Sequence, residues 1–218
     1  MSERVSGRGW VTHSVKGFLV SLVVLGLLGG GLVLFFIKGL YLLPDKVCDA
    51  AVQRDIVIRT LPRARSADEW SEQGGAGRHF SFACRVSTSG HSILSGQVDL
   101  RDSSRTAWED HYGSLAGHQV VRVTAGGVEA LAQTDGDKGS ASVYVPCAPA
   151  TVQEGTASHA YALVADAGVT GRSRATGEEL RQALTDFAYQ LTEHAYKLAE
   201  CRDHRAFPKE LPRYNKDR

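Results

Sequence analysis

Two short segments contain a serine among glycines, an arrangement from which many hydrolases build a nucleophile. In the Gly-x-Ser-x-Gly turn, the glycines permit the strained backbone that exposes the serine. The segment GHSIL at 90–94 lacks the second glycine, and GSLAG at 113–117 lacks the central serine. We therefore expect Ser92 and Ser114 to be ordinary loop serines. An acid pair for hydrolysis stays open, because sequence does not show which carboxylates meet in space.

A second candidate chemistry is metal binding. The segment DGDKGS at 135–140 resembles the start of a calcium loop, but its glycine falls at position 5 instead of 6, and Pro146 occupies position 12. The histidines include no His-x-x-x-His pair. We interpret the Glu109–Asp110–His111 cluster as a solvated helix end and His194 as a boundary residue. We thus expect no metal site, no cofactor and no catalytic residue.

The four cysteines carry the clearest chemical signal. They are widely spaced, and none belongs to a Cys-x-x-Cys pair of the kind that binds zinc or does redox work. An even set of this kind is typical of disulfides in an oxidising compartment. Four reduced, buried thiols are the alternative. The cysteines are Cys48, Cys84, Cys147 and Cys201.

All four cysteines follow an apolar segment, FLVSLVVLGLLGGGLVLFFI at 18–37, that contains no charged residue. Twenty helical residues span about 30 Å, the thickness of a bilayer core. A secretion signal has a shorter apolar region and a small-residue cleavage site, which is missing here. The charged residues Asp45 and Lys46 argue against lipid attachment at Cys48. The sequence therefore predicts a transmembrane helix that is kept as a signal anchor.

Charge on either side of this segment predicts its orientation. Arg4, Arg8 and Lys16 precede it, whereas only Lys38 and Lys46 follow it closely. By the positive-inside rule, the basic segment 1–17 is cytoplasmic, and after a linker at 38–44 the domain at 45–204 lies outside the cell membrane. Within the anchor, Gly26 and Gly30 have the Gly-x-x-x-Gly spacing that lets two helices pack closely. Glycine is also common in unpaired membrane helices.

The charge of the outer domain bears on its partners. Removing the four basic residues and the one acidic residue of 1–44 from the totals of 25 and 24 leaves 21 basic and 23 acidic residues. A domain near −2 has no electrostatic footprint for nucleic acid or anionic lipid.

Period-two alternation predicts a mainly antiparallel sheet in the outer domain. Residues 80–86 and 94–100 alternate apolar and polar side chains on either side of Thr88-Ser89-Gly90, which predicts a hairpin. Further strands are expected at 121–123, 128–132, 143–147 and 159–165, with Pro146 at a strand end or an edge. The polar, Gly-rich residues 63–78 predict an exposed loop.

Helices are expected at three places in this domain. Residues 45–61 suit a helix ended by Pro62, although IVIRT also suits a strand, and 104–112 suit a short helix with Trp108 turned inward. The strongest helix begins at Thr176, whose spacing from Glu179 predicts a capping box. Its apolar stripe comprises Leu180, Leu184, Phe187, Leu191, Ala195, Leu198 and Cys201. The last residues, 205–218, predict a polar tail.

The cysteine positions suggest how the disulfides pair, although three connectivities are possible. FACRV leading to HSILSGQV and YVPCA leading to HAYALVA both contain a strand, a cysteine, a histidine and a second strand. If these are related halves, Cys48 pairs with Cys84 and Cys147 with Cys201, each joining a helix to a strand. Closing these loops of 36 and 54 residues would contribute roughly 3–4 kcal/mol each.

The anchor, the FACRV cysteine, the antiparallel strands and the closing amphipathic helix resemble the anchored, lipoprotein-like extracytoplasmic proteins of actinobacteria. The resemblance covers residues 45–203 in outline and implies an α+β fold outside a bacterial membrane. We expect a binding or interaction domain without catalysis. The alternatives are an envelope hydrolase and an accessory subunit that acts through its membrane helix.

Overall fold

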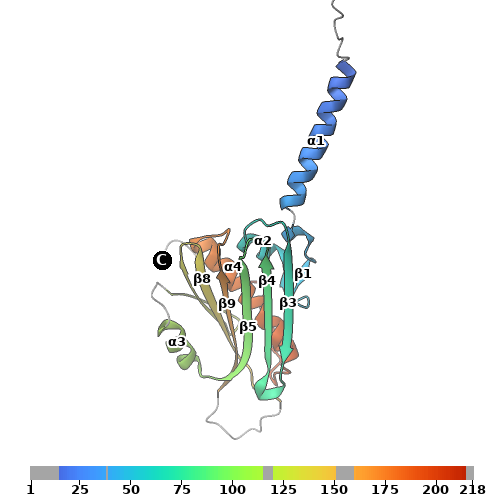
Figure 1. Ribbon diagram of the computed structural model, residues 1–218. Helices are drawn as coiled ribbons and strands as arrows, with labels where there is room; N and C mark the ends of the chain where they lie inside the picture. Colours follow the sequence, from blue (N-terminus) through green and yellow to red (C-terminus); the bar gives the residue numbers. More distant parts are fainter. Residues whose placement is uncertain (1–14, 38, 115–119, 151–159, 215–218) are drawn as a thin grey trace, which may run out of the picture. The chain divides into compact units, whose positions relative to one another are not determined.

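The computed structural model describes residues 15–37, 39–114, 120–150 and 160–214 (Figure 1). The chain forms two compact units, residues 1–36 and residues 37–218. The helices are α1 (Val15–Ile37), α2 (Arg54–Thr60), α3 (Arg105–Ser114) and α4 (Gly177–Leu198), with 3-10 turns η1 (Gly39–Leu42) and η2 (Gly77–His79). The strands are β1 (Lys46–Val47), β2 (Val52–Gln53), β3 (Ala67–Gly74), β4 (Ser81–Thr88), β5 (Ile93–Asp102), β6 (Val121–Ala125), β7 (Val128–Asp135), β8 (Lys138–Pro146) and β9 (Tyr161–Thr170).

The first unit contains α1, which is helical over 23 residues and includes the whole predicted anchor. It has no acidic residue in its first turn and no basic residue in its last turn. In α1 the side chains described are those of 17–27 and 29–31. Among the residues described, no helix has both the length and the hydropathy needed to cross a membrane.

The second unit is an α+β domain built on a seven-stranded antiparallel sheet in the order β3-β4-β5-β9-β8-β7-β6. Each predicted strand is present, and the predicted hairpin is the β4–β5 pair, in which Val86 lies opposite Leu94. We call β3–β4–β5 the N-terminal half-sheet and β6–β7–β8–β9 the C-terminal half-sheet. The two halves meet where β5 pairs with β9 over ten residues.

The inner face of the sheet is buried under α4, which Figure 1 shows behind the strands, and α2 packs against α4. The stripe of α4 packs there as predicted from Leu180 to Ala195, all fully buried. Gly96 of β5 marks the closest approach, since a Cβ there would lie 2.6 Å from Leu191 Cδ1. The sheet contributes alternating residues to the same core, among them Phe82, Leu94, Val98, Val143 and Leu163.

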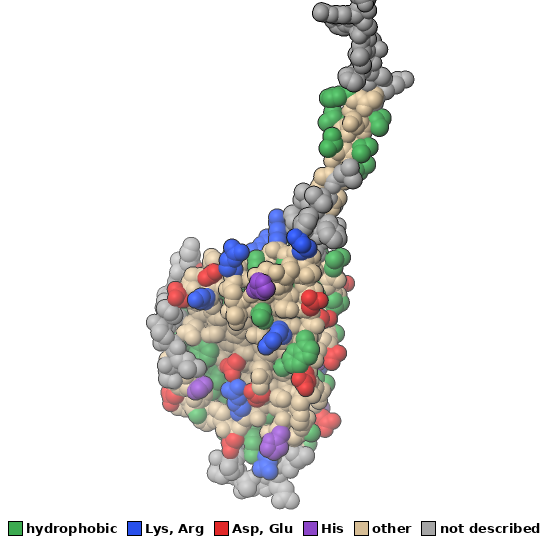
Figure 2. All heavy atoms as spheres, in the orientation of Figure 1, with side chains coloured by type: hydrophobic (Ala, Val, Ile, Leu, Met, Phe, Trp, Pro, Cys, Tyr) green, Lys and Arg blue, Asp and Glu red, His purple; other side chains and the backbone are tan. Residues whose placement is uncertain are grey.

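The outer face of the sheet is covered over only one half. Trp108 of α3 is buried against Tyr144 and Val164, and its indole Nε1 donates a hydrogen bond of 2.8 Å to Ser142 Oγ. This confirms the inward Trp108 that the sequence predicts. No helix of the described residues packs on the outer face of β3 and β4. Figure 2 views this face and shows acidic and basic side chains interspersed across its middle.

Two disulfides join Cys48 to Cys84 and Cys147 to Cys201, which confirms the predicted pairing. The prediction that each joins a helix to a strand is wrong. Cys48 lies in the turn between β1 and β2, and Cys201 follows α4 and pairs in a β-bridge with Pro149. Each disulfide fastens an end of the covering layer to the sheet.

Two segments before the hairpin differ from expectation. Residues 45–61 form the two-stranded β1–β2 sheet followed by α2, so the helix is only seven residues long. Residues 63–78 contain the edge strand β3 instead of a loop. An edge strand that is exposed on most of its length needs no alternation of apolar and polar residues. Strand β3 is instead held by its hydrogen bonds to β4.

The ends of α4 correct two further predictions. Thr176 is the N-cap residue, but its side chain forms no capping hydrogen bond, so the predicted capping box is not made. Leu198 is 36% exposed and the helix ends there, so the stripe does not continue to Cys201. The predicted polar tail, as far as Tyr214, returns along α4, with Leu211 and Tyr214 buried.

Candidate functional site

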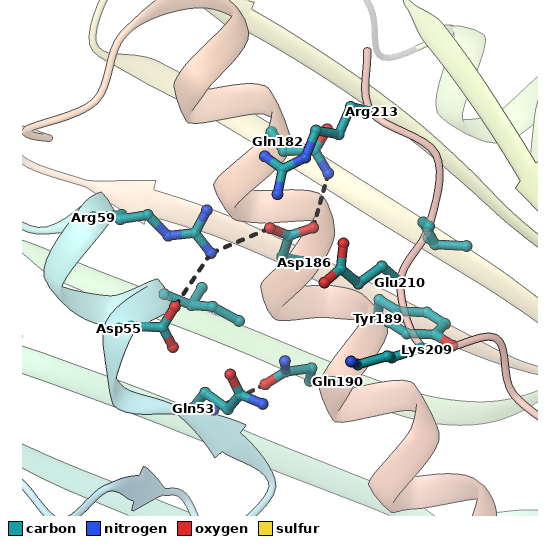
Figure 3. A pocket seen from close by; sticks show the side chains of 12 residues that line it. Gln53, Asp55, Arg59, Gln182, Asp186, Tyr189, Gln190, Lys209, Glu210 and Arg213 are labelled. Atoms are coloured by element: carbon teal, nitrogen blue, oxygen red, sulfur yellow. Dashed lines mark hydrogen bonds and ion pairs between the residues drawn. The ribbon is translucent and has the colours of Figure 1, made fainter.

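A groove of about 470 Å³ lies between α2, α4 and residues 209–213 of the C-terminal segment (Figure 3). Of its twelve lining residues, only Ile56 and Leu211 are aliphatic. The charged ones are three acids and three bases, so the groove is polar without a net charge. Its polar lining is Gln53, Asp55, Arg59, Gln182, Asp186, Tyr189, Gln190, Lys209, Glu210 and Arg213.

The C-terminal segment forms one wall because three polar contacts hold it against α4. Tyr189 donates its hydroxyl hydrogen to the Pro208 carbonyl, and Tyr214 N donates to Gln182 Oε1 at 3.2 Å. The hydroxyls of Thr185 and Tyr214 lie 2.9 Å apart in a buried position. Burial raises the pKa of Tyr214 to about 12, so this hydroxyl stays protonated and able to donate.

The opposite wall contains an ion-pair network centred on Arg59 of α2. Figure 3 shows its guanidinium between Asp55 and Asp186, at 3.7 Å and 3.3 Å from their carboxylate oxygens. Gln182 Nε2 donates a 2.8 Å hydrogen bond to the other oxygen of Asp186. Burial raises the pKa of Asp186, although Gln182 and Arg59 act in the opposite direction. This network fixes α2 against α4.

Three charged side chains of the groove form no direct polar contact within the described part of the chain, although the Arg213 charge acts on Asp186. Lys209, Glu210 and Arg213 form no hydrogen bond or ion pair through their side chains with other residues that the structure describes. All three come from the C-terminal segment, and Figure 3 shows them around the groove that Arg59 and Asp186 close on the other side. They are the groups that a ligand can engage without breaking an existing contact.

A smaller hollow of about 150 Å³ continues the groove along α4 and shares Gln53, Tyr189, Gln190 and Lys209 with it. Gln190 Oε1 accepts a 2.8 Å hydrogen bond from the Gln53 backbone, which holds β2 beside α4. His194 lines the far end, with its ring 5.0 Å from that of Phe82. Burial lowers the pKa of His194.

The groove is suited to binding through hydrogen bonds and charge pairs. Two of its three acids, Asp55 and Asp186, both bind Arg59, so their carboxylates are engaged in ion pairs within the fold. No cluster of three or more His, Cys, Asp or Glu residues suited to a metal ion occurs within the described chain.

Of the candidate catalytic and metal-binding residues in the sequence, His194 lines the adjoining hollow and the others lie away from both cavities. Glu109 is bound by Arg122 at 2.6 Å and by Arg105 at 2.9 Å, and these contacts lower its pKa. Ser92 is buried, and its backbone NH donates to Thr88 Oγ1 at 3.2 Å. Asp135 and Lys138 close the β7–β8 hairpin as a strand turn.

Sequence reasoning missed the groove because its residues come from three separate segments. The segment at 209–213 looked like a polar tail, and Asp186 and Gln190 looked like the solvent face of an amphipathic helix. The available signal was three large apolar or aromatic side chains, Phe207, Leu211 and Tyr214, in a segment rich in charged residues. No family model, curated protein or solved structure matches the chain.

Proposed function

We propose that the chain is a single-pass membrane protein that holds a binding or interaction domain outside the cell membrane. The observation that carries the binding role is the polar groove with Lys209, Glu210 and Arg213 on one wall. Their side chains form no hydrogen bond or ion pair with the described residues that a ligand would have to break, although the Arg213 charge also acts on Asp186. A partner with complementary charged groups gains from all three.

Location rests on two supports. The segment 18–37 has no charged residue, and α1 is helical across it, so its backbone groups outside the terminal turns are hydrogen-bonded within the helix, as a bilayer requires. The outer domain contains two disulfides and no free cysteine, the state expected in an oxidising compartment. Together with the basic residues before the segment, these support a cytoplasmic N-terminus.

The membrane proposal is tested with the full chain and a deletion of 18–37. The full chain should stay in the membrane pellet after alkaline carbonate extraction, whereas the deletion variant should be released. Alkaline phosphatase fused behind Arg218 should be active, because it folds only outside the cytoplasm, and a green fluorescent protein at the same place should be dark. Release of the full chain by carbonate, or the opposite reporter pattern, would reject the proposal.

The binding proposal is tested by site-specific photo-crosslinking in intact membranes. A photoreactive amino acid at Gln190, inside the groove, should give a discrete adduct, and one at Asp68, on the edge strand β3, should not. Adding Lys209→Glu and Arg213→Glu should abolish the adduct, because both charge contacts then become repulsive. No adduct at Gln190, or an adduct that survives the double charge reversal, would remove the groove from consideration.

The proposal leaves a role for α1 beyond anchoring. Gly26 and Gly30 have no neighbouring atom that would contact an added Cβ within 4 Å, so this strip of the helix surface is open in the single chain. Two membrane helices that approach along such a strip gain close packing. Replacing both glycines with leucine should weaken self-association in a membrane two-hybrid assay, and an unchanged signal would rule out helix pairing there.

A further inference from the structure

A second groove, of about 480 Å³, crosses the open outer face of the sheet from β3 to β9. It lies on the opposite face from α2 and α4 and shares no residue with the groove described above. The residues whose side chains belong to this face are Trp70, Ala83, Arg85, Ser95, Gln97, Asp166 and Gly168. We call it the sheet groove.

Strand register explains why these residues meet. Trp70 lies opposite Arg85 across the β3–β4 pair, Arg85 opposite Ser95, and Ser95 opposite Gly168. The next row on the same face places Ala83 opposite Gln97 and Gln97 opposite Asp166. Residues directly opposite one another in an antiparallel sheet have Cβ atoms about 5 Å apart, so both rows are continuous surfaces.

Side-chain size gives the sheet groove its depth. Three of its residues are small, Ala83 on β4, Ser95 on β5 and Gly168 on β9, and they leave space above the sheet between the larger Arg85 and Gln97. At one end stands Trp70, whose side chain is 50% exposed on the edge strand. At the other end, α3 covers the sheet, with Tyr112 bound to the Ser140 carbonyl at 2.8 Å. The exposed indole, with Arg85 opposite it on β4, offers a flat apolar platform at this end of the groove.

The polar groups beside this platform are held in place by one another. Arg101 donates to Asp99 at 2.9 Å and to Asp166 at 3.0 Å, and Gln97 Nε2 donates to Asp99 at 2.8 Å. These side chains are planar and present paired donors or acceptors. The charged side chains that line the groove, Arg85 and Asp166, are of opposite sign, so the groove favours a neutral ligand with many hydroxyl groups.

We propose that the sheet groove binds a neutral oligosaccharide built of pyranose units. The C–H face of one sugar ring stacks on Trp70, and hydroxyls of units further along the chain exchange hydrogen bonds with Gln97 and Asp166, which lie two and three strands away from Trp70. The shallow, open shape suits the side of a chain, so the ligand is a stretch of polysaccharide and not a single enclosed sugar. This proposal does not depend on the α2–α4 groove, because the two sites lie on different faces.

Other occupants match the site less well. A nucleic acid or anionic polymer would meet Asp166, Asp99 and Glu72 on this face without an excess of bases to offset them. An acyl chain needs more apolar surface than one indole provides. A peptide strand added to the sheet would pair with the free edge of β3 and would leave the groove on the face unfilled.

The test is calorimetric titration of the full-length protein in nanodiscs with four neutral hexasaccharides: α-1,4-glucan, β-1,4-glucan, β-1,3-glucan and α-1,6-mannan. At least one should bind saturably. Trp70→Ala should weaken that binding at least tenfold, Trp70→Phe less, and Asp166→Asn about tenfold. Tyr41→Ala removes a ring of matching exposure, 49%, outside the groove and should leave the affinity unchanged, as should Arg213→Ala.

Circular dichroism and thermal unfolding of each variant separate loss of binding from loss of fold. The proposal is overturned if none of the four sugars binds the folded protein, or if Trp70→Ala and Trp70→Phe both bind as the unchanged chain does. It is also overturned if Trp70→Ala converts a dimer to a monomer in sedimentation experiments, since a second copy would then be the occupant. Equal weakening by Arg213→Ala would place the sugar in the α2–α4 groove instead.

Discussion

The N-terminal half-sheet and the C-terminal half-sheet each contain an antiparallel meander that ends in a central strand, β5 in one and β9 in the other. Each has its inner face under the same helical layer and is fastened by one disulfide. The two half-sheets differ on the outer face. Trp108 of α3 is 3% exposed over the C-terminal half, and Trp70 of β3 is 50% exposed on the N-terminal half.

This difference shows which surfaces the fold needs. The inner face alone supplies one continuous core that includes residues of both half-sheets, so the domain does not require a second covering layer across its whole width. Where a cover exists, it closes a separate small cluster of Trp108, Tyr112, Leu131 and Tyr144. Among the described residues no helix covers the outer face of the N-terminal half-sheet, so a ligand bound there would not disturb the core.

The two tryptophans should differ most in their effect on stability. Trp108→Ala should lower the free energy of unfolding by about 3–5 kcal/mol, because it opens a cavity and leaves Ser142 Oγ without its donor. Trp70→Ala should change it by about 1 kcal/mol or less. Urea denaturation followed by circular dichroism measures both. Equal losses would show that the open face is as necessary to the fold as the covered one.

The two disulfides should stabilise the domain by similar amounts. Their loops differ only from 36 to 54 residues, and loop-closure entropy depends on the logarithm of length. Replacing either pair by serine should cost about 4 kcal/mol, with the two values within about 0.5 kcal/mol of each other. The measurement is urea denaturation of each double variant. A loss confined to one pair would mean that one half-sheet unfolds without the other.

A glycine on each of the two central strands, Gly96 of β5 and Gly168 of β9, allows the inner and outer faces of the sheet to be compared. Gly96→Ala on the inner face should destabilise the protein by about 1–3 kcal/mol, because the added Cβ would lie 2.6 Å from Leu191 Cδ1 and 2.9 Å from Phe187 Cε1. Gly168→Ala on the outer face meets only the Gly139 carbonyl at 3.4 Å and should be nearly neutral. Chemical denaturation distinguishes them. A reversed order would contradict the assignment of α4 to the inner face.

The sequence predicted those elements in which burial of one face makes the apolar residues recur at regular spacing. Strands β4 and β5 alternate cleanly because one face is in the core, and the stripe of α4 follows from the same cause. Edge strand β3 has no such period because it is exposed on most of its length, and its partner β4 determines its conformation. The predicted helix at 45–61 was too long because β1 and β2, which pair only with each other, occupy its first half.

The candidate sites were out of reach for a different reason. Asp186, Arg59 and Arg213 are far apart in sequence and look like solvent-facing charges on their own segments. Only the return of the C-terminal segment along α4 brings them to one groove. Trp70 likewise carries no signal in a polar stretch until register places Ser95 and Gly168 beside it. The disulfide pairing was predictable because the two cysteine-containing segments resemble each other.

The smallest effect should be a pH dependence that belongs to the inner side of the domain. His194 packs its ring on Phe82, and burial lowers its pKa below the usual 6.5, with the Asp49 charge opposing and the Lys197 charge adding to the shift. Between the lowered pKa and 6.5, the unfolded chain binds more protons than the folded one. The free energy of unfolding should therefore rise with pH through that window. The stability contributed by neutral His194 is lost as the pH falls from 6.5 through the folded-state pKa.

Replacing His194 by glutamine should flatten this part of the stability profile, which urea midpoints measured between pH 5 and pH 7.5 would show. His79→Gln, at an exposed histidine of η2, is the matched control substitution. Because a lowered pKa requires the imidazole to be partly withdrawn from water, an identical slope in His194→Gln would mean that His194 faces solvent. The hollow at the end of the α2–α4 groove would then be wider than its lining residues indicate.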